Sequence, residues 1–300
     1  MIRFSKGALL SAAALMISAG ATFATTWNVP GNFSTIQAAI NSSSVRDGDA
    51  LQITASLTDN GFNCTKRLTI YSPTQYQWIR ENGLIQVSSY VIFRNLYIYT
   101  YTNGNLIRTN AGKANGIEVY GCVLYGGGSS SNFIIDDYGI GGDGTGSNGV
   151  GGLNFYNTTL TGAGEGIDGY NAHNVYTSGC NFQWNSKGIY YRSYVSGNDN
   201  SMAVDGTTFT SNYTSYGYSA QTLFPNVSGY DQVRYYNSYF TAGGTGSVPI
   251  ILAGKTYAYI QNNTFYNCPT GVDWTKTSTD IISASGNTDY SGSNCHPGSY

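Results

Sequence analysis

Acidic and basic side chains gather between residues 108 and 192, although charged residues make up only 10% of the chain. Carboxylates can act as general acids or bases, or as hard oxygen ligands of a cation such as Ca²⁺. A neighbouring Lys or Arg can neutralise a uronate or act on its α-proton, as a polysaccharide lyase requires. The candidate catalytic residues are Asp136, Asp137, Asp168, Lys187 and Arg192, and the three aspartates are also the candidate Ca²⁺ ligands.

Aromatic and further polar residues accompany these charges. The candidate substrate-binding residues are Arg108, Tyr138, Tyr170, Tyr190 and His173. The glycine-rich stretch 139–152 is expected to form a loop beside them. No catalytic spacing motif is complete, and every soluble protein needs some exposed charges. The residue types alone therefore leave open whether this segment is a ligand site or a solubilising surface.

An internal repeat indicates what would position these residues. Seven segments share an eight-residue template with apolar or β-preferring residues at its first, third and last positions: 91–98, 117–124, 153–160, 175–182, 202–209, 233–240 and 258–265. Their last residues lie 22 to 36 residues apart. A period of this length, with short strands and no helical pattern, predicts one coil of a parallel β-solenoid.

Most coils carry a further strand after the template, introduced by Gly or an apolar residue. These strands are expected at 134–136, 166–168, 188–190, 248–252 and 271–273. The prediction is an all-β solenoid of roughly nine three-strand coils, in which six residues at the last template position stack inside: Leu124, Leu160, Phe182, Phe209, Phe240 and Phe265. An antiparallel sandwich or barrel would instead show hairpin signals about every 8 to 12 residues. On the further strand, aspartates of adjacent coils would lie about 5 Å apart on one outward groove.

The sixth template position is mostly small or polar: Leu96, Cys122, Thr158, Cys180, Thr207, Ser238 and Asn263. Such groups, stacked about 4.8 Å apart, can fill a tight corner and satisfy turn backbone groups. The coil of Thr158 separates Cys122 from Cys180, so these two thiols should stay reduced. Cys268 and Cys295 are about one coil apart and are expected to form a disulfide, which leaves Cys64 without a partner.

Tyrosines dominate the outward positions of the first template strand, at Tyr120, Tyr156, Tyr176, Tyr236 and Tyr259. Such a column could stack against sugar rings or against another solenoid. Cross-strand pairing that merely stabilises a half-exposed sheet explains it equally well.

The template and the opening segment Trp27-Asn-Val-Pro-Gly-Asn-Phe-Ser-Thr-Ile-Gln-Ala-Ala-Ile40, followed by Asp47-Gly-Asp-Ala-Leu-Gln-Ile53, resemble the pectin-lyase-like right-handed parallel β-helix superfamily. The resemblance covers about residues 27–290. It implies a right-handed coil and a short amphipathic capping helix over 36–40, with Ser34 or Thr35 as its N-cap. It also implies that the sheet carrying Asp136 and Asp168 lines the substrate groove.

Specific enzyme signatures of that superfamily are incomplete. Gly166-Ile-Asp-Gly169 is similar to the Asp-Gly-Ile-Asp region of polygalacturonase-like glycosidases, but the paired aspartates precede it and no Gly-His-Gly or Arg-Ile-Lys follows. Gly31-Asn-Phe-Ser-Thr-Ile-Gln37 is similar to the opening of pectin methylesterases, whose downstream catalytic aspartates are missing. Neither activity is carried over to this chain.

The first 24 residues have the pattern of a secretory leader. Arg3 and Lys6 precede an apolar run over 8–17, and small residues around Ala24 suit leader-peptidase cleavage. We therefore expect a leader over 1–24 and one β-helix domain over 25–300. The mature protein would be secreted, at the cell surface or in the periplasm. No later segment is long and apolar enough to span a membrane.

Charge and composition limit the partners. The 14 basic and 16 acidic residues give a net charge of −2, which excludes a nucleic-acid binder. The leading hypothesis is an exported β-helix that binds an extracellular polysaccharide, and cleavage by a lyase or glycoside hydrolase is left open. The alternative is a structural surface protein, an adhesin or filament subunit, that packs through Tyr- and Asn-rich faces and adds end to end.

Overall fold

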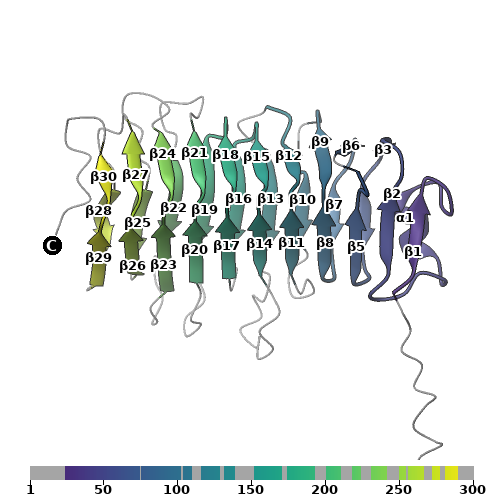
Figure 1. The fold of residues 1–300 in the computed structure, drawn as a ribbon, viewed down its shortest axis with the longest axis horizontal. Helices are drawn as coiled ribbons and strands as arrows, with labels where there is room; N and C mark the ends of the chain where they lie inside the picture. Colours follow the sequence, from purple (N-terminus) through teal and green to yellow (C-terminus); the bar gives the residue numbers. More distant parts are fainter. Residues whose placement is uncertain are drawn as a thin grey trace, which may run out of the picture.

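The computed structural model describes residues 24–74, 76–102, 104–109, 116–128, 132–138, 152–170, 174–192, 201–210, 218–223, 231–241, 250–254, 256–266, 272–277 and 281–289. These residues form an elongated stack of coils (Figure 1), built from three sheets whose neighbouring strands all run parallel. The fold is the right-handed parallel β-helix that the repeat and the resemblance predicted.

Each coil adds one strand to each sheet in turn. Over the described ranges, the first sheet has 11 strands: β1 (Thr26–Val29), β2 (Ala50–Ile53), β5 (Leu68–Tyr71), β8 (Val91–Arg94), β11 (Ile117–Tyr120), β14 (Leu153–Tyr156), β17 (Asn174–Ser178), β20 (Ser201–Asp205), β23 (Asp231–Tyr236), β26 (Thr256–Gln261) and β29 (Ile281–Ser285). The second sheet has 10: β3 (Leu57–Asp59), β6 (Gln77–Glu81), β9 (Leu96–Thr100), β12 (Val123–Tyr125), β15 (Thr159–Thr161), β18 (Asn181–Gln183), β21 (Thr208–Thr210), β24 (Tyr239–Thr241), β27 (Thr264–Tyr266) and β30 (Thr288–Asp289).

The third sheet has 9 strands within the same described ranges: β4 (Phe62–Cys64), β7 (Ile85–Val87), β10 (Ile107–Thr109), β13 (Phe133–Tyr138), β16 (Glu165–Tyr170), β19 (Lys187–Arg192), β22 (Tyr218–Leu223), β25 (Ile250–Gly254) and β28 (Val272–Thr277). The further strands expected at 134–136, 166–168 and 188–190 correspond to β13, β16 and β19. Those expected at 248–252 and 271–273 correspond to β25 and β28.

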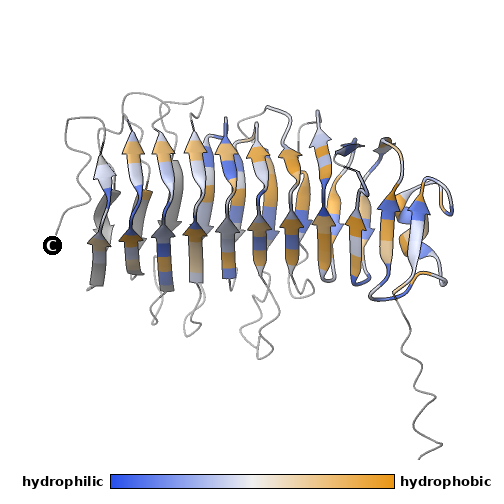
Figure 2. Cartoon of the chain, viewed as in Figure 1, coloured by the Kyte–Doolittle hydropathy of each residue, from blue (hydrophilic) through white to orange (hydrophobic). Residues whose placement is uncertain are grey.

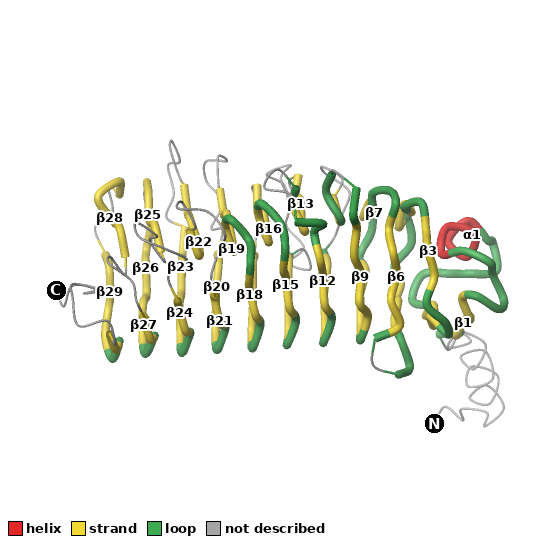
Figure 3. Tube along the Cα trace, turned by 90° about the horizontal axis from the view of Figure 1, so that it is seen from above, coloured by secondary structure: helices red, strands yellow, loops and turns green. Residues whose placement is uncertain are grey.

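A short helix, α1 (Ile36–Asn41), closes the N-terminal end of the stack (Figure 3). The side chain of Thr35 accepts a hydrogen bond from the backbone N–H of Ala38 at 3.1 Å, so Thr35 is the N-cap. Ile36, Ala39 and Ile40 are buried. The helix therefore covers the apolar end of the first coils, as predicted. No helix in the described part of the chain is long and apolar enough to cross a membrane.

Apolar side chains stack in columns inside the coils, and Figure 2 shows apolar positions repeating from strand to strand. The rings of Phe182, Phe209 and Phe240 lie 5.0 and 4.9 Å apart and almost parallel. All six predicted core residues are at most 1% exposed: Leu124, Leu160, Phe182, Phe209, Phe240 and Phe265. The predicted register of the template is therefore confirmed.

The corner between the first and second sheets has a left-handed residue in each of eight successive coils. Its φ lies between 49° and 66° at Asn95, Gly121, Asn157, Gly179, Gly206, Asn237, Asn262 and Gly286. Asn and Gly tolerate this conformation best. At Gly179 a side chain would also be too close to the preceding rung, because an added Cβ would lie 2.5 Å from Oδ1 of Asn157.

The next residue of each coil forms the expected polar ladder. The Ser238 hydroxyl accepts a hydrogen bond from the Thr207 N–H at 3.2 Å, and Asn263 Oδ1 accepts one from the Ser238 N–H at 2.9 Å. Cys122 and Cys180 are buried free thiols in this ladder, as predicted, and Cys64 is also free. Burial raises the pKa of Cys122 to about 12, which keeps its thiol protonated and unreactive. Cys268 and Cys295 lie outside the described residues.

Two carboxyl groups face the interior near the N-terminal end. Asp59 of β3 and Glu81 of β6 pair across adjacent rungs, and they are 6% and 0% exposed. Glu81 Oε2 accepts a hydrogen bond from the Gly61 N–H at 3.0 Å, while Glu81 Oε1 and Asp59 Oδ2 have no hydrogen-bond partner among the described residues. Burial and the neighbouring Asp59 raise the pKa of Glu81 to about 8. Glu81 is therefore largely protonated at neutral pH.

Replacing Phe209 with Ala should lower the free energy of unfolding by about 3 to 5 kcal/mol, because the ring leaves a cavity between Phe182 and Phe240. Tyr239→Ala, at a position on β24 that is 37% exposed, should cost under about 1 kcal/mol. Equilibrium denaturation in urea measures both. Equal losses in the two variants would show that the phenylalanine column does not form the core.

Stability should fall as pH rises from about 4.5 to about 8, because the folded chain holds the Glu81 proton more tightly than the unfolded chain does. Because glutamine cannot ionise, the Glu81→Gln variant should lose less stability than the parent over this pH range. Thermal melts across this pH range test the prediction, and a parent-like slope in Glu81→Gln would refute it.

Candidate functional site

The third sheet carries a column of polar residues on its outer face. The register pairs Arg108 with Asp136, Asp136 with Asp168, and Asp168 with Tyr190. Neighbouring rungs are about 4.8 Å apart. The strands therefore bring together the predicted residues Arg108, Asp136, Asp168 and Tyr190. We call these four residues the polar column.

Asp136 holds Arg108 in place. Asp136 Oδ2 accepts hydrogen bonds from Arg108 Nε at 2.7 Å and from Asn105 Nδ2 at 2.5 Å. The carboxylate is nearly covered, at 8% side-chain exposure, whereas the Arg108 side chain is 44% exposed. Within the described residues, the two terminal guanidinium nitrogens of Arg108 make no hydrogen bond. Arg108 is thus a fixed, half-exposed cation with donors left for a ligand.

A second ion pair joins Glu165 of β16 to Lys187 of β19, the two strands that follow β13 in the third sheet. Lys187 donates a hydrogen bond to Glu165 Oε1 at 2.8 Å, and its Nζ lies 3.8 Å from the centre of the Tyr190 ring. Glu165 and Asp168 are 8% and 4% exposed. Lys187 therefore compensates the charge of Glu165, and both carboxylates are largely shielded from solvent.

Asp137 does not belong to the outward face. It is fully buried, and its Oδ1 accepts a hydrogen bond from the Thr109 hydroxyl at 2.6 Å. Successive strand residues point to opposite faces, so Asp136 and Asp137 cannot both face the groove. No cluster of three or more His, Cys, Asp or Glu side chains suited to a metal occurs among the described residues. The expectation that Asp136, Asp137 and Asp168 converge on one cation does not hold for Asp137.

The structure describes the remaining candidates only in part. Tyr138, Tyr170 and Arg192 have paired backbones on β13, β16 and β19, and Tyr170 is in register with both others. His173 and the loop segment 139–151 lie outside the described residues.

The tyrosine column of the first sheet packs largely against itself. The rings of Tyr120 and Tyr156 lie 4.6 Å apart at 7°, and the Arg94 guanidinium lies 4.6 Å from the centre of the Tyr120 ring. Arg94 and Tyr156 are on the rungs before and after Tyr120, so they occupy its two faces. These contacts stabilise the sheet, and both faces of the Tyr120 ring are occupied by protein side chains.

A second group of aromatic side chains, which sequence reasoning missed, lies on the outer face of the second sheet. We call Trp78, Tyr97, Tyr99, Tyr101 and Tyr125 the aromatic cluster. Trp78 is on β6, Tyr97 and Tyr99 are on β9, Tyr101 follows β9, and Tyr125 is on β12. Three successive rungs therefore contribute rings. The alternating Tyr-x-Tyr-x-Tyr of 97–101 was the sequence signal for this face.

The rings of the aromatic cluster meet mostly at steep angles. Tyr101 makes edge contacts with Tyr99 at 5.2 Å and with Tyr125 at 6.0 Å, and Trp78 lies tilted 6.0 Å from Tyr99. Tyr101 is 64% exposed and Trp78 is 39% exposed. Arg80 lies 5.7 Å from the Tyr101 ring centre and adds a cation to the patch. Ring surface therefore remains open to solvent, unlike on the first sheet.

Local backbone features fix this cluster beside the polar column. The Tyr125 ring lies so close to Gly162 that an added Cβ there would be 2.4 Å from it. Buried Asn132 accepts a hydrogen bond from Gly104 N–H at 2.9 Å and donates one to the Gly126 carbonyl at 3.1 Å. These bonds tie together the corners that lead from β9 to β10 and from β12 to β13. The aromatic cluster and the polar column thus lie on shared coils, on either side of the corner between the second and third sheets.

No protein-family model matches this sequence, and a comparison with curated proteins gave no match.

Proposed function

We propose that this protein binds an extracellular polysaccharide at the corner between the second and third sheets. The observation that carries the proposal is the aromatic cluster, in which Trp78 and Tyr101 expose large parts of their rings. Tyr and Trp are amphipathic, with an apolar ring and a polar tip. The C–H faces of pyranose rings pack on such rings, and sugar hydroxyls bond to the tips.

The polar column supplies charged hydrogen-bond donors, which the rings of the aromatic cluster lack. Arg108 offers donors to sugar oxygens or to a uronate carboxylate, and it is already held by Asp136, so little side-chain entropy is lost on binding. The Tyr97 hydroxyl, like that of any tyrosine, is a donor at neutral pH, and burial and the neighbouring tyrosines raise its pKa further. A glycan that crosses the corner would stack on the second sheet and make hydrogen bonds on the third.

Membership of the pectin-lyase-like superfamily is part of the same proposal. It is supported by the parallel β-helix and by the capping helix at Ile36–Asn41. We propose binding rather than cleavage, because Asp136 and Glu165 are each tied to a cation. A carboxylate in an ion pair is held in its ionised form, so it is better suited to position its cation than to transfer a proton to or from a substrate. The leader pattern of residues 1–24 supports a site of action outside the cytoplasm.

The structural alternative rests on the same exposed rings. A second copy of the chain could cover the aromatic cluster, since Tyr and Trp are enriched at protein interfaces. Sedimentation of the mature protein separates the two hypotheses: a monomer that binds glycans favours the first, and self-association lost with the cluster favours the second.

Trp78→Ala combined with Tyr101→Ala should weaken polysaccharide binding about 100-fold, at about tenfold per ring. Affinity electrophoresis through gels containing glucan, xylan, polygalacturonate or alginate measures the retardation. Tyr120→Ala combined with Tyr156→Ala, on the first sheet, is the matched control and should bind as the parent does. Unchanged retardation of the first variant, or an equal loss in the control, would contradict the proposal.

Arg108→Ala should weaken binding to the retained glycan about tenfold through loss of charge-assisted hydrogen bonds. Arg234→Ala removes an exposed arginine from the first sheet and should have no effect. A reducing-sugar and unsaturated-product assay on the same glycans tests cleavage. If Arg108→Ala binds as the parent does, the ligand does not reach the third sheet.

A further inference from the structure

The carboxylate of Asp49 collects three donors at the start of the fold. Its oxygens accept hydrogen bonds from the Thr25 N–H at 2.8 Å, the Arg46 N–H at 2.9 Å and the Trp27 indole N–H at 3.0 Å. Asp49 is 5% exposed. Burial alone would raise the pKa of this carboxyl, but the hydrogen bonds outweigh it and lower the pKa. The group is thus an ionised, preformed acceptor.

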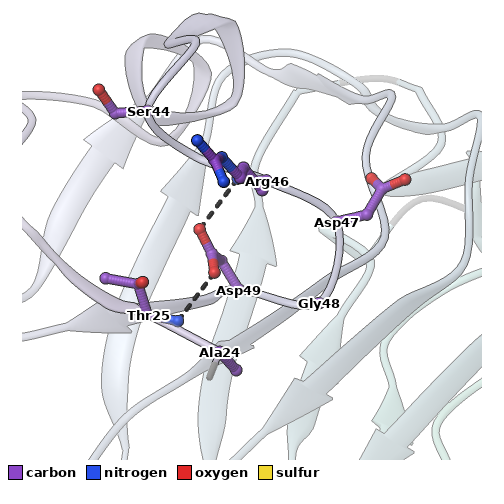
Figure 4. Close-up of a pocket in the computed structure, with 7 residues that line it drawn as sticks. All are labelled: Ala24, Thr25, Ser44, Arg46, Asp47, Gly48 and Asp49. Carbon is purple, nitrogen blue, oxygen red and sulfur yellow. Dashed lines mark hydrogen bonds between the residues drawn. The ribbon is translucent and has the colours of Figure 1, made fainter. Parts of the chain in front are cut away.

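Thr25 is the first residue after the expected leader. Ala24 and Thr25 are exposed and line a pocket of about 420 Å³, together with Arg46, Asp47 and Asp49 (Figure 4). The dashed lines in Figure 4 join Asp49 to the backbone of Thr25 and of Arg46. The nitrogen that cleavage after Ala24 would release is therefore already in contact with a carboxylate.

We propose that Asp49 is the binding site for the α-ammonium group that leader removal creates on Thr25. This inference rests on cleavage after Ala24 and is independent of polysaccharide binding. Hydrolysis of the Ala24–Thr25 peptide bond adds water: the carboxylate stays on Ala24, and the amine of Thr25 takes up a proton at neutral pH. The neutral N–H that now contacts Asp49 becomes a cation at the same place.

The new charge strengthens the contact that closes the first coil. A hydrogen bond between an ammonium and a carboxylate is stronger than one from a neutral amide. Thr25 is held from the other side as well, because its carbonyl accepts a hydrogen bond from the Ala50 N–H at 2.8 Å. Thr26 and Ala50 are in register on β1 and β2. Processing therefore locks the register of β1 against β2 at the open end of the stack.

Asp49 is the carboxylate in direct contact with the Thr25 nitrogen. Arg46 and Asp47, on the same segment before β2, also line the pocket, but Asp47 Oδ1 accepts a hydrogen bond from the Arg67 N–H. Direct contact with the Asp49 carboxylate favours the charged amine, so the pKa of the amine should rise above the usual value of about 7.7 to 8.0. The stability gained is present below that usual value. It is lost as pH rises through the raised pKa of the folded protein.

The test is a titration of the Thr25 amine in the mature protein, after mass spectrometry of the exported protein has defined its N-terminus. Reductive ¹³C-methylation keeps the amine charged and gives an NMR signal for it. We expect a pKa about one unit or more above the ordinary value in the parent. The value should return to normal in Asp49→Asn, and it should stay raised in Asp47→Asn, a neighbouring carboxylate whose Oδ1 accepts the Arg67 N–H instead.

If Asp49→Asn does not fold, a mature chain that begins at Ala24 and keeps Asp49 provides a second test. It moves the ammonium by one residue and should melt at a lower temperature than the Thr25 form at neutral pH, with the difference vanishing at high pH. An exported chain that begins elsewhere, an ordinary amine pKa in the parent, or equal melting of the two forms overturns the proposal. None of these results bears on glycan binding.

Discussion

The left-handed residue at the corner between the first and second sheets is the constraint on which the stack depends. In eight successive coils it is Asn or Gly with nearly the same φ. It ends the first-sheet strand, turns the chain, and places the next side chain where it can accept the backbone N–H of the preceding rung, as Ser238 does for Thr207. Loops of very different length can be inserted elsewhere in a coil because this corner restores the register each time.

The in-register stacking of the coils determines how side chains are arranged on the surface. Since equivalent positions repeat about every 4.8 Å, each outward position becomes a column of side chains. In the first sheet the side chains of such a column pack against one another, and the Tyr120 ring lies between Arg94 and Tyr156. In the second sheet the rings around Tyr101 meet edge to face and stay open. The same residue type thus stabilises one sheet and forms a candidate binding surface on another.

Much of the fold could be predicted from the sequence because it is repeated there. The template located Phe209 and its neighbours in the core, and the polar ladder from Cys122 to Asn263 was expected at the corner. The capping helix after Thr35 was implied by the resemblance of the opening segment to the pectin-lyase-like superfamily. These features depend on local spacing, which a sequence displays directly.

The site could be predicted only in part, because it depends on strand parity and on coils that depart from the template. Asp136 and Asp137 are adjacent, and only the register shows which of them faces outward. The aromatic cluster was missed because Trp78 lies in a coil without a template match and Tyr99, Tyr101 and Tyr125 lie beyond the ends of the template segments. Charged residues are expected at the surface, and the buried Glu81 beside Asp59 breaks that expectation.

The central claim is that a polysaccharide binds across the corner between the second and third sheets. Hydrogen–deuterium exchange of the mature protein, with and without the polysaccharide that retards it most in affinity electrophoresis, tests this claim most directly. The account predicts slower exchange at the corner segments 104–106 and 126–128, with no change in β14 and β20 of the first sheet. Protection confined to the first sheet, or none at the corner under saturating polysaccharide, would contradict it.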